Sequence, residues 1–270
     1  AKADQTAPDE DTLTVIHTNS DSSNDGVISS VNDTMEYSLD GGTTWLPIAE
    51  NLTAIDSLPI GDVKLRYKGT DVKNASAAIT VTVHEKETQD APLVTSFTVD
   101  KTTGEDIADG SISGFDSTKK YEYSIDDGVT WIDVADGSES ITGFKPGNIK
   151  IRYKGDNNKK PSDAVTVVLG YKTGQDTPDA DKITITNTSG VNENNGVISG
   201  VDSTMEYSTD NGVTWNEVTG TTITGLSAGT VKLRYKETSD KNASDSIELT
   251  IIAKADQTAP DEDTLTVIHT

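Results

Sequence analysis

The chain has 270 residues, a formal net charge of −23 and a pI near 4.3, and only 33% of its residues are hydrophobic. So acidic a chain excludes a nucleic-acid partner, which needs clusters of Lys and Arg, and it has no apolar run of about 18 residues that could span a membrane. Zero cysteines exclude disulfides and thiolate metal sites. A single core of this size needs more apolar side chains, so several small cores are expected.

Recurring motifs divide the chain into three repeats. MEYSLDGGTTW begins at Met35 and returns as YEYSIDDGVTW at Tyr121 and as MEYSTDNGVTW at Met205. A shorter motif, VKLRYK or IKIRYK, follows each copy, and the three tryptophans lie 86 and 84 residues apart. These spacings predict three domains and the start of a fourth, at residues 1–86, 87–171, 172–254 and 255–270.

The first repeat shows a hydrophobic period of two, which is typical of β-strands. In VKLRYK, for example, Val63, Leu65 and Tyr67 alternate with Lys64, Arg66 and Lys68, and the basic residues are expected to form a solvated strand face. Glycine-containing pairs and triplets separate the strands and indicate turns. In chain order, strands are expected near 13–17, 26–31, 34–39, 43–49, 52–58, 62–68 and 77–84.

Seven short antiparallel strands in about 84 residues are typical of an immunoglobulin-like or fibronectin-like β-sandwich. The predicted fold is therefore all-β, with three such domains in tandem forming an elongated rod. Because the cysteine pair of antibody domains is missing, Trp45, Trp131 and Trp215 are expected to be buried and to anchor the three cores.

Acidic, proline-containing stretches separate the repeats and are expected to be short connectors. They cover residues 85–92, 172–181 and 254–263, the last copied at 2–11, and each places Pro after a Gln-Asp or Asp-Gln pair. Pro restricts the chain, and repulsion among the acidic groups favours extension. Stiff connectors between similar domains predict a rod rather than a globule.

Residues 253–270 are identical to residues 1–18, an offset of 252. Leu265–His269 therefore repeats the first strand, Leu13–His17, without the six strands that should follow it. We expect the tail to continue into, or to pair with, a further copy of repeat one, so that copies join head to tail. The alternative is an overlap produced by the choice of the cloned segment.

The motif S-x-D-x-G-x-T-W occurs once in each repeat and resembles the Asp-box, a hairpin of bacterial sialidases and other β-propellers. The resemblance implies a structural turn, remote from any active site, in which the Asp accepts backbone amides and the Trp packs inward. Seven strands per repeat also exceed the four of a propeller blade, so we expect no enzyme. The matching residues are Ser38, Asp40, Gly42 and Trp45, then Ser124, Asp126, Gly128 and Trp131, then Ser208, Asp210, Gly212 and Trp215.

No residue is a candidate for catalysis or cofactor binding. The three His are absent from repeat two, so no site common to all repeats uses imidazole. Oxygen ligands of the kind that Ca²⁺ prefers occur in two acidic runs, without the spacing of an EF-hand. Bound calcium is therefore the lesser alternative to solvated loops at Asp21, Asn24 and Asp25 and at Asp9, Glu10 and Asp11.

The repeated β-pattern resembles the tandem immunoglobulin-like repeats of long bacterial surface proteins, adhesin stalks especially. The resemblance implies an extracellular, cell-surface location and a structural role: a stalk or fibre segment that projects or links other parts. The alternatives are a multivalent carbohydrate- or protein-binding array and an accessory region of a secreted glycan-active enzyme. A glycan binder needs exposed aromatic side chains. A host or cell-wall glycan or protein would bind at a tip outside this sequence.

Overall fold

The computed structural model describes residues 1–255, in which every repeat has seven strands. All seven strands expected in repeat one are present, and a short 3₁₀ helix, η1 (Glu10–Thr12), precedes them. The strands of repeat one are β1 (Thr14–Ile16), β2 (Gly26–Ser29), β3 (Met35–Ser38), β4 (Leu46–Pro47), β5 (Ala54–Leu58), β6 (Gly61–Tyr67) and β7 (Ile79–Val83).

Repeats two and three have the same sequence of elements, each opening with a 3₁₀ helix, η2 (Val94–Ser96) or η3 (Ala180–Lys182). Repeat two contains β8 (Thr98–Asp100), β9 (Gly110–Ser113), β10 (Tyr121–Ser124), β11 (Ile132–Asp133), β12 (Ser140–Phe144), β13 (Gly147–Tyr153) and β14 (Val165–Leu169). Repeat three contains β15 (Thr184–Thr186), β16 (Gly196–Ser199), β17 (Met205–Ser208), β18 (Asn216–Glu217), β19 (Thr222–Leu226), β20 (Gly229–Tyr235) and β21 (Ile247–Ile251).

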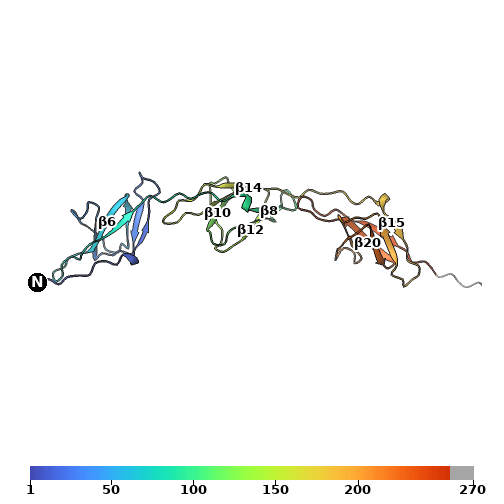
Figure 1. Ribbon diagram of the computed structural model, residues 1–270, viewed down its shortest axis with the longest axis horizontal. Coiled ribbons are helices and arrows are strands. Elements are labelled where there is room, and N and C mark those ends of the chain that lie inside the picture. Colours follow the sequence, from blue (N-terminus) through green and yellow to red (C-terminus); the bar gives the residue numbers. More distant parts are fainter. Residues whose placement is uncertain (256–270) are drawn as a thin grey trace, which may run out of the picture. The chain divides into compact units, whose positions relative to one another are not determined.

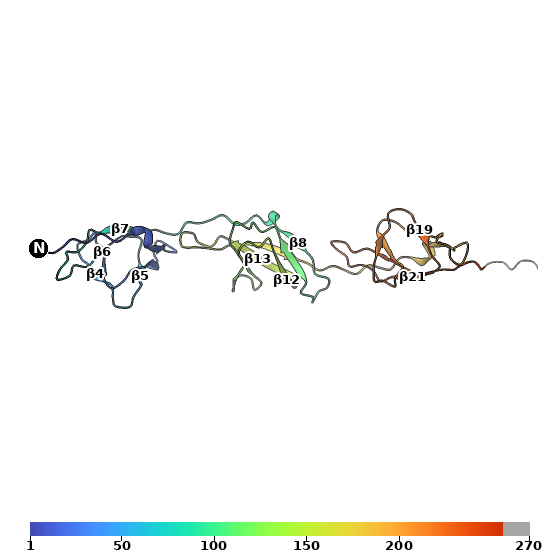
Figure 2. The same ribbon diagram turned by 90° about the horizontal axis from the view of Figure 1, so that it is seen from below.

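Each repeat forms one three-stranded and one four-stranded sheet. In repeat one the orders are β1-β2-β5 and β4-β3-β6-β7, and the corresponding strands of the other repeats follow the same orders. In repeat three, β15 and β20 (Figure 1), like β19 and β21 (Figure 2), belong to different sheets. Sheets of three and four strands are those of a fibronectin- or immunoglobulin-like sandwich, so the expected all-β fold of three tandem domains is confirmed.

The alternation along β6 explains how the two sheets close a core. Val63 and Leu65 are 1% and 0% exposed and pack with Ile28 and Ile55 of the facing sheet. Repeat three buries the equivalent residues, such as Leu233 and Ile198. Because side chains alternate between faces, a slip of one residue would expose this whole set. The hydrophobic pattern therefore fixes the strand register.

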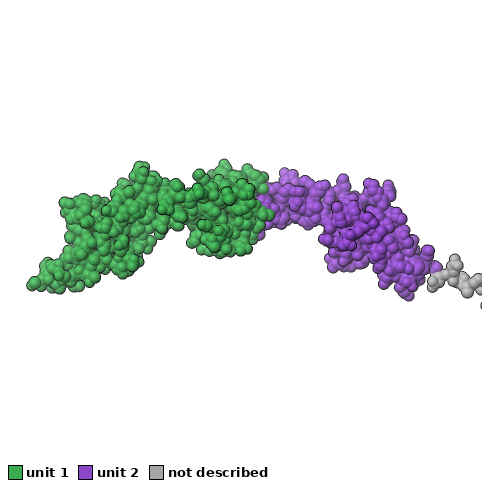
Figure 3. Space-filling model, in the orientation of Figure 1, with its two compact units in different colours: residues 1–98, 112–141, 147–168 green, residues 99–111, 142–146, 169–270 purple. Residues whose placement is uncertain are grey.

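By contacts within the chain, two compact units are distinguished (Figure 3). Repeat two contributes residues to both units, so the boundaries expected near 86 and 171 remain predictions. In the part of the chain that the structure describes, no helix is long and apolar enough to cross a membrane. The copied strand Leu265–His269 lies outside the described residues. The units comprise residues 1–98, 112–141 and 147–168, and residues 99–111, 142–146 and 169–270.

Candidate functional site

The turn between β3 and β4 is held by the side chains of the Asp-box-like motif. Ser38, fully buried, donates from Oγ to Asp40 Oδ1 at 2.8 Å and accepts from the amide of Gly42 at 2.8 Å. Asp40 also accepts from the amide of Thr44 at 2.8 Å and from its hydroxyl at 2.5 Å. Both carboxylate oxygens are therefore occupied by groups of the hairpin itself.

The same network recurs in the other two hairpins. Asp126 accepts from the hydroxyl of Ser124 at 2.7 Å and from the amide of Thr130 at 2.8 Å, and Asp210 accepts from its equivalent partners at 2.7 and 2.9 Å. Hydrogen bonds from the Thr hydroxyl and amide, and then from the Ser hydroxyl, lower the pKa of Asp40, Asp126 and Asp210 to about 2. These carboxylates are therefore ionised at neutral pH.

Backbone geometry explains the glycine of the motif. Gly42 has φ +99°, and its two equivalents have φ +94° and +93°, a left-handed conformation that any residue with a Cβ atom rarely adopts. The preceding position is also left-handed, and it carries the three residue types that tolerate this conformation best. They are Gly41, Asp127 and Asn211, with φ of 74°, 61° and 63°.

The tryptophan of each hairpin lies on the outer face of the four-stranded sheet, so the expectation of buried, core-anchoring Trp45, Trp131 and Trp215 is wrong. All three are half-buried, and none belongs to the buried cores. The Arg66 guanidinium lies over the Trp45 ring, 3.7 Å from the centroid, and Trp45 Nε1 donates to the Gly42 carbonyl at 3.0 Å. The strand β4 has only two residues, so alternation does not carry through the turn to place the ring inside.

Arg66 also forms an ion pair, which corrects the expectation of a solvated Lys64-Arg66-Lys68 face. Its Nε lies 2.7 Å from Glu36 Oε1, and the two side chains are 27% and 16% exposed. Glu36 is the direct cross-strand neighbour of Arg66, a position where opposite charges stabilise a sheet. The equivalent sets are Trp131, Arg152 and Glu122, with distances of 3.7 and 2.6 Å, and Trp215, Arg234 and Glu206, with distances of 3.8 and 2.7 Å.

The candidate calcium ligands lie in two places and form hydrogen bonds of their own. Asp25 accepts from the hydroxyl of Ser23 at 2.6 Å and from the amide of Asn19 at 3.2 Å, in the loop that also carries Asp21 and Asn24. Asp9 caps η1 by accepting from the amide of Asp11 at 3.1 Å, while Glu10 lies within that helix. Among residues 1–255, no group of three or more His, Asp or Glu side chains is placed to hold a metal ion.

The stretch between repeats one and two is hydrogen-bonded to both of them. The amide of Lys86 donates to the Thr18 carbonyl of repeat one at 2.8 Å, and the amide of the next residue, Glu87, donates to the Asn158 carbonyl of repeat two at 2.8 Å. The Glu87 carbonyl accepts from the amide of Lys160 at 2.8 Å. Adjacent peptide groups therefore belong to different domains. We call this arrangement the junction.

The junction between repeats two and three has the same hydrogen bonds. The amide of Lys172 donates to the Thr102 carbonyl at 2.7 Å, and that of Thr173 donates to the Asp240 carbonyl at 2.9 Å. The Thr173 carbonyl accepts from the amide of Asn242 at 2.9 Å. Thr18 and Thr102, which receive the chain in the two junctions, are both 0% exposed. A buried threonine thus marks the upstream side of each junction.

Side chains cross the two junctions in different ways. In the first, the Lys160 ammonium pairs with Glu85 and lowers the pKa of that carboxyl. In the second, Lys101 pairs with Asp240 and lowers its pKa. Also in the second junction, a hydrogen bond to Glu237 raises the pKa of Lys172, whose side chain is only 9% exposed. Both junctions are therefore held by ion pairs in addition to backbone hydrogen bonds.

A glutamine fixes the start of each repeat to the loop that follows its sixth strand. In repeat two, Gln89 Nε2 donates to the carbonyls of Lys154 at 3.1 Å and Lys160 at 2.7 Å. Gln5 and Gln175 make the equivalent pairs of bonds. Three residues after each glutamine a proline is buried: Pro8, Pro92 and Pro178. The acidic stretches at 2–11, 85–92 and 172–181 are therefore docked on the repeats to which these glutamines bond, while most of the stretch at 254–263 lies outside the described residues.

The sequence does mark this glutamine by its constant distance from a proline, but the spacing alone does not reveal what the glutamine binds. Gln5, Gln89 and Gln175 each precede a proline by three residues in otherwise variable stretches. Only the fold shows that the carbonyls they reach belong to the loop between the sixth and seventh strands. The buried threonines Thr18, Thr102 and Thr188 were likewise not anticipated.

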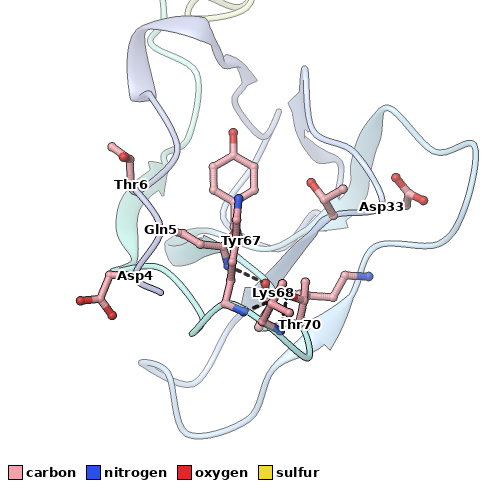
Figure 4. A pocket seen from close by; sticks show the side chains of 11 residues that line it. Asp4, Gln5, Thr6, Asp33, Tyr67, Lys68 and Thr70 are labelled. Carbon is pink, nitrogen blue, oxygen red and sulfur yellow. Dashed lines mark hydrogen bonds between the residues drawn. The ribbon is translucent and has the colours of Figure 1, made fainter. Parts of the chain in front are cut away.

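An open cavity of about 960 Å³ lies beside the glutamine of repeat one. Figure 4 shows the Tyr67 ring standing between the segment of Asp4, Gln5 and Thr6 and the side chain of Asp33. An equivalent cavity of about 790 Å³ in repeat three is lined by Tyr235, Gln175 and Asp176, among others. Both cavities combine one aromatic wall with polar groups.

Comparison with known proteins gives a likeness in fold only. No protein-family model matches the sequence, and no curated protein matches it. The crystal structure of the chicken CNTN1 FN1–FN3 domains covers 88% of this chain and 97% of its own, at 11% identity and a TM-score of 0.30. The two-domain fibronectin type-III segment from chicken tenascin covers 60% and 99%, at 17% identity and a TM-score of 0.22. The assignment of the β-sandwich fold rests on the six sheets themselves.

Proposed function

We propose that this chain is a stalk or fibre segment of a repetitive bacterial cell-surface protein, and that its repeats form a stiff array that projects or links other parts. The observation that carries the proposal is the junction. Consecutive amides, those of Lys86 and Glu87, bond to successive repeats, and those of Lys172 and Thr173 do the same. Further copies of the same repeats, joined head to tail, are the partners it implies.

The hydrogen bonds of the junction support the proposed stiffness. A flexible linker needs residues whose backbone dihedrals are free, and hinges are a few such residues. Here the peptide groups on both sides of the junction are hydrogen-bonded, and Gln89 holds the chain three residues after Lys86. Bending at the junction therefore has to break hydrogen bonds or ion pairs. That requirement suits a spacer that has to hold its length.

The stiffness is tested by measuring distances across the first junction. The chain lacks cysteine, so spin labels are attached at Asp56→Cys and Asp136→Cys, both exposed positions, and distances come from double electron–electron resonance. We expect one narrow distribution, broadened by two glycines inserted between Lys86 and Glu87. The same insertion after the exposed Asn51 serves as the control and leaves it narrow. A native distribution as broad as that of the junction insertion would contradict the proposal.

The cell-surface location needs a separate test. Antibodies raised against the purified chain are applied to intact and to permeabilised cells of the source organism, followed by immunogold electron microscopy. We expect label on intact cells, at a distance from the envelope that grows with the number of repeats. Label confined to permeabilised cells would contradict a surface role and leave the stiffness of the array unaffected.

A second candidate function, multivalent glycan binding, is favoured by the cavities of repeats one and three. Tyr67 and Tyr235 supply the aromatic wall on which a sugar ring stacks, and neighbouring Asp and Gln side chains supply hydrogen bonds. Calorimetry with cell-wall-derived oligosaccharides tests it. Binding that is lost in Tyr67→Ala with Tyr235→Ala, and retained in Tyr37→Ala, supports this function. No binding by the native chain overturns it.

A further inference from the structure

Both halves of a third kind of junction are present in this one chain. On the upstream side, the amide of Lys254 donates to the carbonyl of the buried Thr188 at 3.3 Å, as Lys86 does to Thr18. On the downstream side, the amide of Ala3 donates to the Val72 carbonyl at 2.9 Å, as Glu87 does to Asn158. Lys254 is followed by Ala255, the same dipeptide as Lys2 and Ala3.

We propose that repeat three joins a following repeat one through these two halves, and that Asn74 of the following copy donates from Nδ2 to the Ser189 carbonyl of the preceding copy. The inference rests on the proposed head-to-tail array, and it names the surfaces and the contact by which copies meet. One surface is the loop of repeat one at residues 69–74. The other is the end of repeat three around residues 187–195 and 252–254.

Asn74 already has the geometry of its equivalent in a formed junction. In repeat three, Asn242 Nδ2 lies 3.5 Å from the Lys172 carbonyl and donates to the Thr103 carbonyl of repeat two at 2.7 Å. In repeat one, Asn74 Nδ2 lies the same 3.5 Å from the Lys2 carbonyl, and its other bond, at 2.8 Å, goes to Asp4. The second hydrogen of the Asn74 amide is thus bonded to Asp4, at the place where a junction would offer the backbone carbonyl of the preceding repeat.

The accepting loop is preformed as well. Thr103 and Ser189 both follow the buried threonine of the upstream side, and their amides are held alike. Thr103 donates to Asp109 Oδ1 at 3.0 Å, and Ser189 donates to Asn195 Oδ1 at 3.0 Å. The Ser189 carbonyl therefore occupies the position at which Thr103 accepts from Asn242.

The third junction differs from the other two in its charges. Ala253 takes the position of Glu85, and Asn74 takes that of Lys160, so neutral residues replace the ion pair of the first junction. In the same way, Asn187 takes the position of Lys101 and Val72 that of Asp240, which pair in the second junction. Gly69 stands where Glu237 pairs with Lys172, and Lys2 Nζ instead donates to the Thr70 carbonyl at 2.7 Å. The third junction is therefore held by neutral contacts, which salt does not weaken, whereas the exposed ion pairs of the first two junctions are screened by salt.

The test uses two full units in tandem, residues 1–252 followed by a second copy of residues 1–254. Ser189→Cys is placed in the first unit and Asn74→Cys in the second, and a short bis-maleimide reports their proximity. The positive control is Thr103→Cys with Asn242→Cys, across the junction between repeats two and three. The negative control has the first pair in reversed order, with Asn74→Cys in the first unit and Ser189→Cys in the second. Asn74, Thr103 and Ser189 are exposed and Asn242 is half-buried, so folding is expected to be retained.

We expect the forward pair to crosslink as fast as the positive control and about 100-fold faster than the reversed pair, because adjacent thiols have a high effective concentration. Spin-label distances across the third junction should also stay unchanged when NaCl rises from about 0.05 to about 1 M, while those across the first two junctions broaden. A forward pair no faster than the reversed pair would overturn the inference. If the forward pair crosslinks quickly but the first junction is broad even at low salt, the stiff stalk is wrong and the contact stands.

Discussion

The amides of Lys86 and Glu87, neighbours in the chain, donate to carbonyls of two different repeats at the same distance of 2.8 Å. Most domain boundaries fall in exposed, flexible segments that few contacts cross. Here two consecutive peptide groups bond to successive repeats, and the residues after them are held by the hydrogen bonds of Gln89 and by the buried Pro92. Several consequences of this arrangement are open to measurement.

Removing the glutamine should loosen the start of a repeat. Gln89→Ala deletes two hydrogen bonds to backbone carbonyls, so the free energy of unfolding of repeat two should fall by about 1–2 kcal/mol. Urea denaturation of the full chain measures it. Thr88→Ala, at the exposed neighbouring position, is the control and should change stability little. Equal effects of the two substitutions would show that the glutamine is not a clamp.

The outer position of the tryptophan makes it less important for stability than a core residue. Trp131→Ala removes a half-buried ring and its contact with Arg152, at a cost of about 1–2 kcal/mol. Ile151→Ala, at 0% exposure, should cost about 2–5 kcal/mol. Ile125→Ala, at a 61% exposed position, is the neutral control. A tryptophan substitution as costly as Ile151→Ala would place the ring in the core after all.

Acid should destabilise all three hairpins together. The pKa of Asp40, Asp126 and Asp210 is lowered from 3.8 to about 2 in the folded state, so the unfolded chain binds more protons between those values. Their stabilising contribution is complete above pH 3.8 and is lost as pH falls through about 2.

Stability measured between pH 5 and 2 should therefore fall, and Asp126→Asn should make the fall shallower. Asp136→Asn, on an exposed side chain of the same repeat, is the charge-matched control. If both variants lose stability with falling pH as steeply as the native chain does, the hairpin carboxylates are not the source of the acid sensitivity.

The histidine at the first junction should make repeat one sensitive to mild acid. Burial, and then the charges of His84 and Lys86, lower the pKa of His17 from 6.5, and its Nδ1 accepts from the amide of His84 at 3.0 Å. Protonation removes this acceptor. The unfolded state binds the proton first, so stability should decline as pH drops below 6.5, until pH falls below the lowered pKa.

Repeat three supplies the matched variant for this histidine. Asn187 stands at the equivalent position and accepts from the amide of Ile252 at 2.9 Å without titrating. His17→Asn should therefore keep the hydrogen bond and flatten the stability of repeat one between pH 7 and pH 5. Denaturation curves at several pH values measure this pH dependence of stability. If it is the same in His17→Asn as in the native chain, His17 is not its origin.

The sequence was sufficient for the strands and the cores, because the period of two in segments such as Val63–Tyr67 identifies the buried face directly. It failed at Trp45, since the turn at Gly41 and Gly42 interrupts the alternation, and the ring lies beneath Arg66 of another strand. It also failed at the acidic stretches, whose composition is that of a loop. Their docking depends on carbonyls that only the folded β6–β7 loop presents.

The hydrogen bonds at the junctions also affect where proteases can cleave the chain. A protease needs several consecutive residues in an extended, unbonded form, and it finds them in exposed loops rather than in hydrogen-bonded segments. The bond between Lys86 and Glu87, although it follows a lysine, has hydrogen-bonded peptide groups on both sides. Limited digestion should therefore cut first within repeats, at exposed loops, and the fragments should carry intact junctions joining parts of two neighbouring repeats.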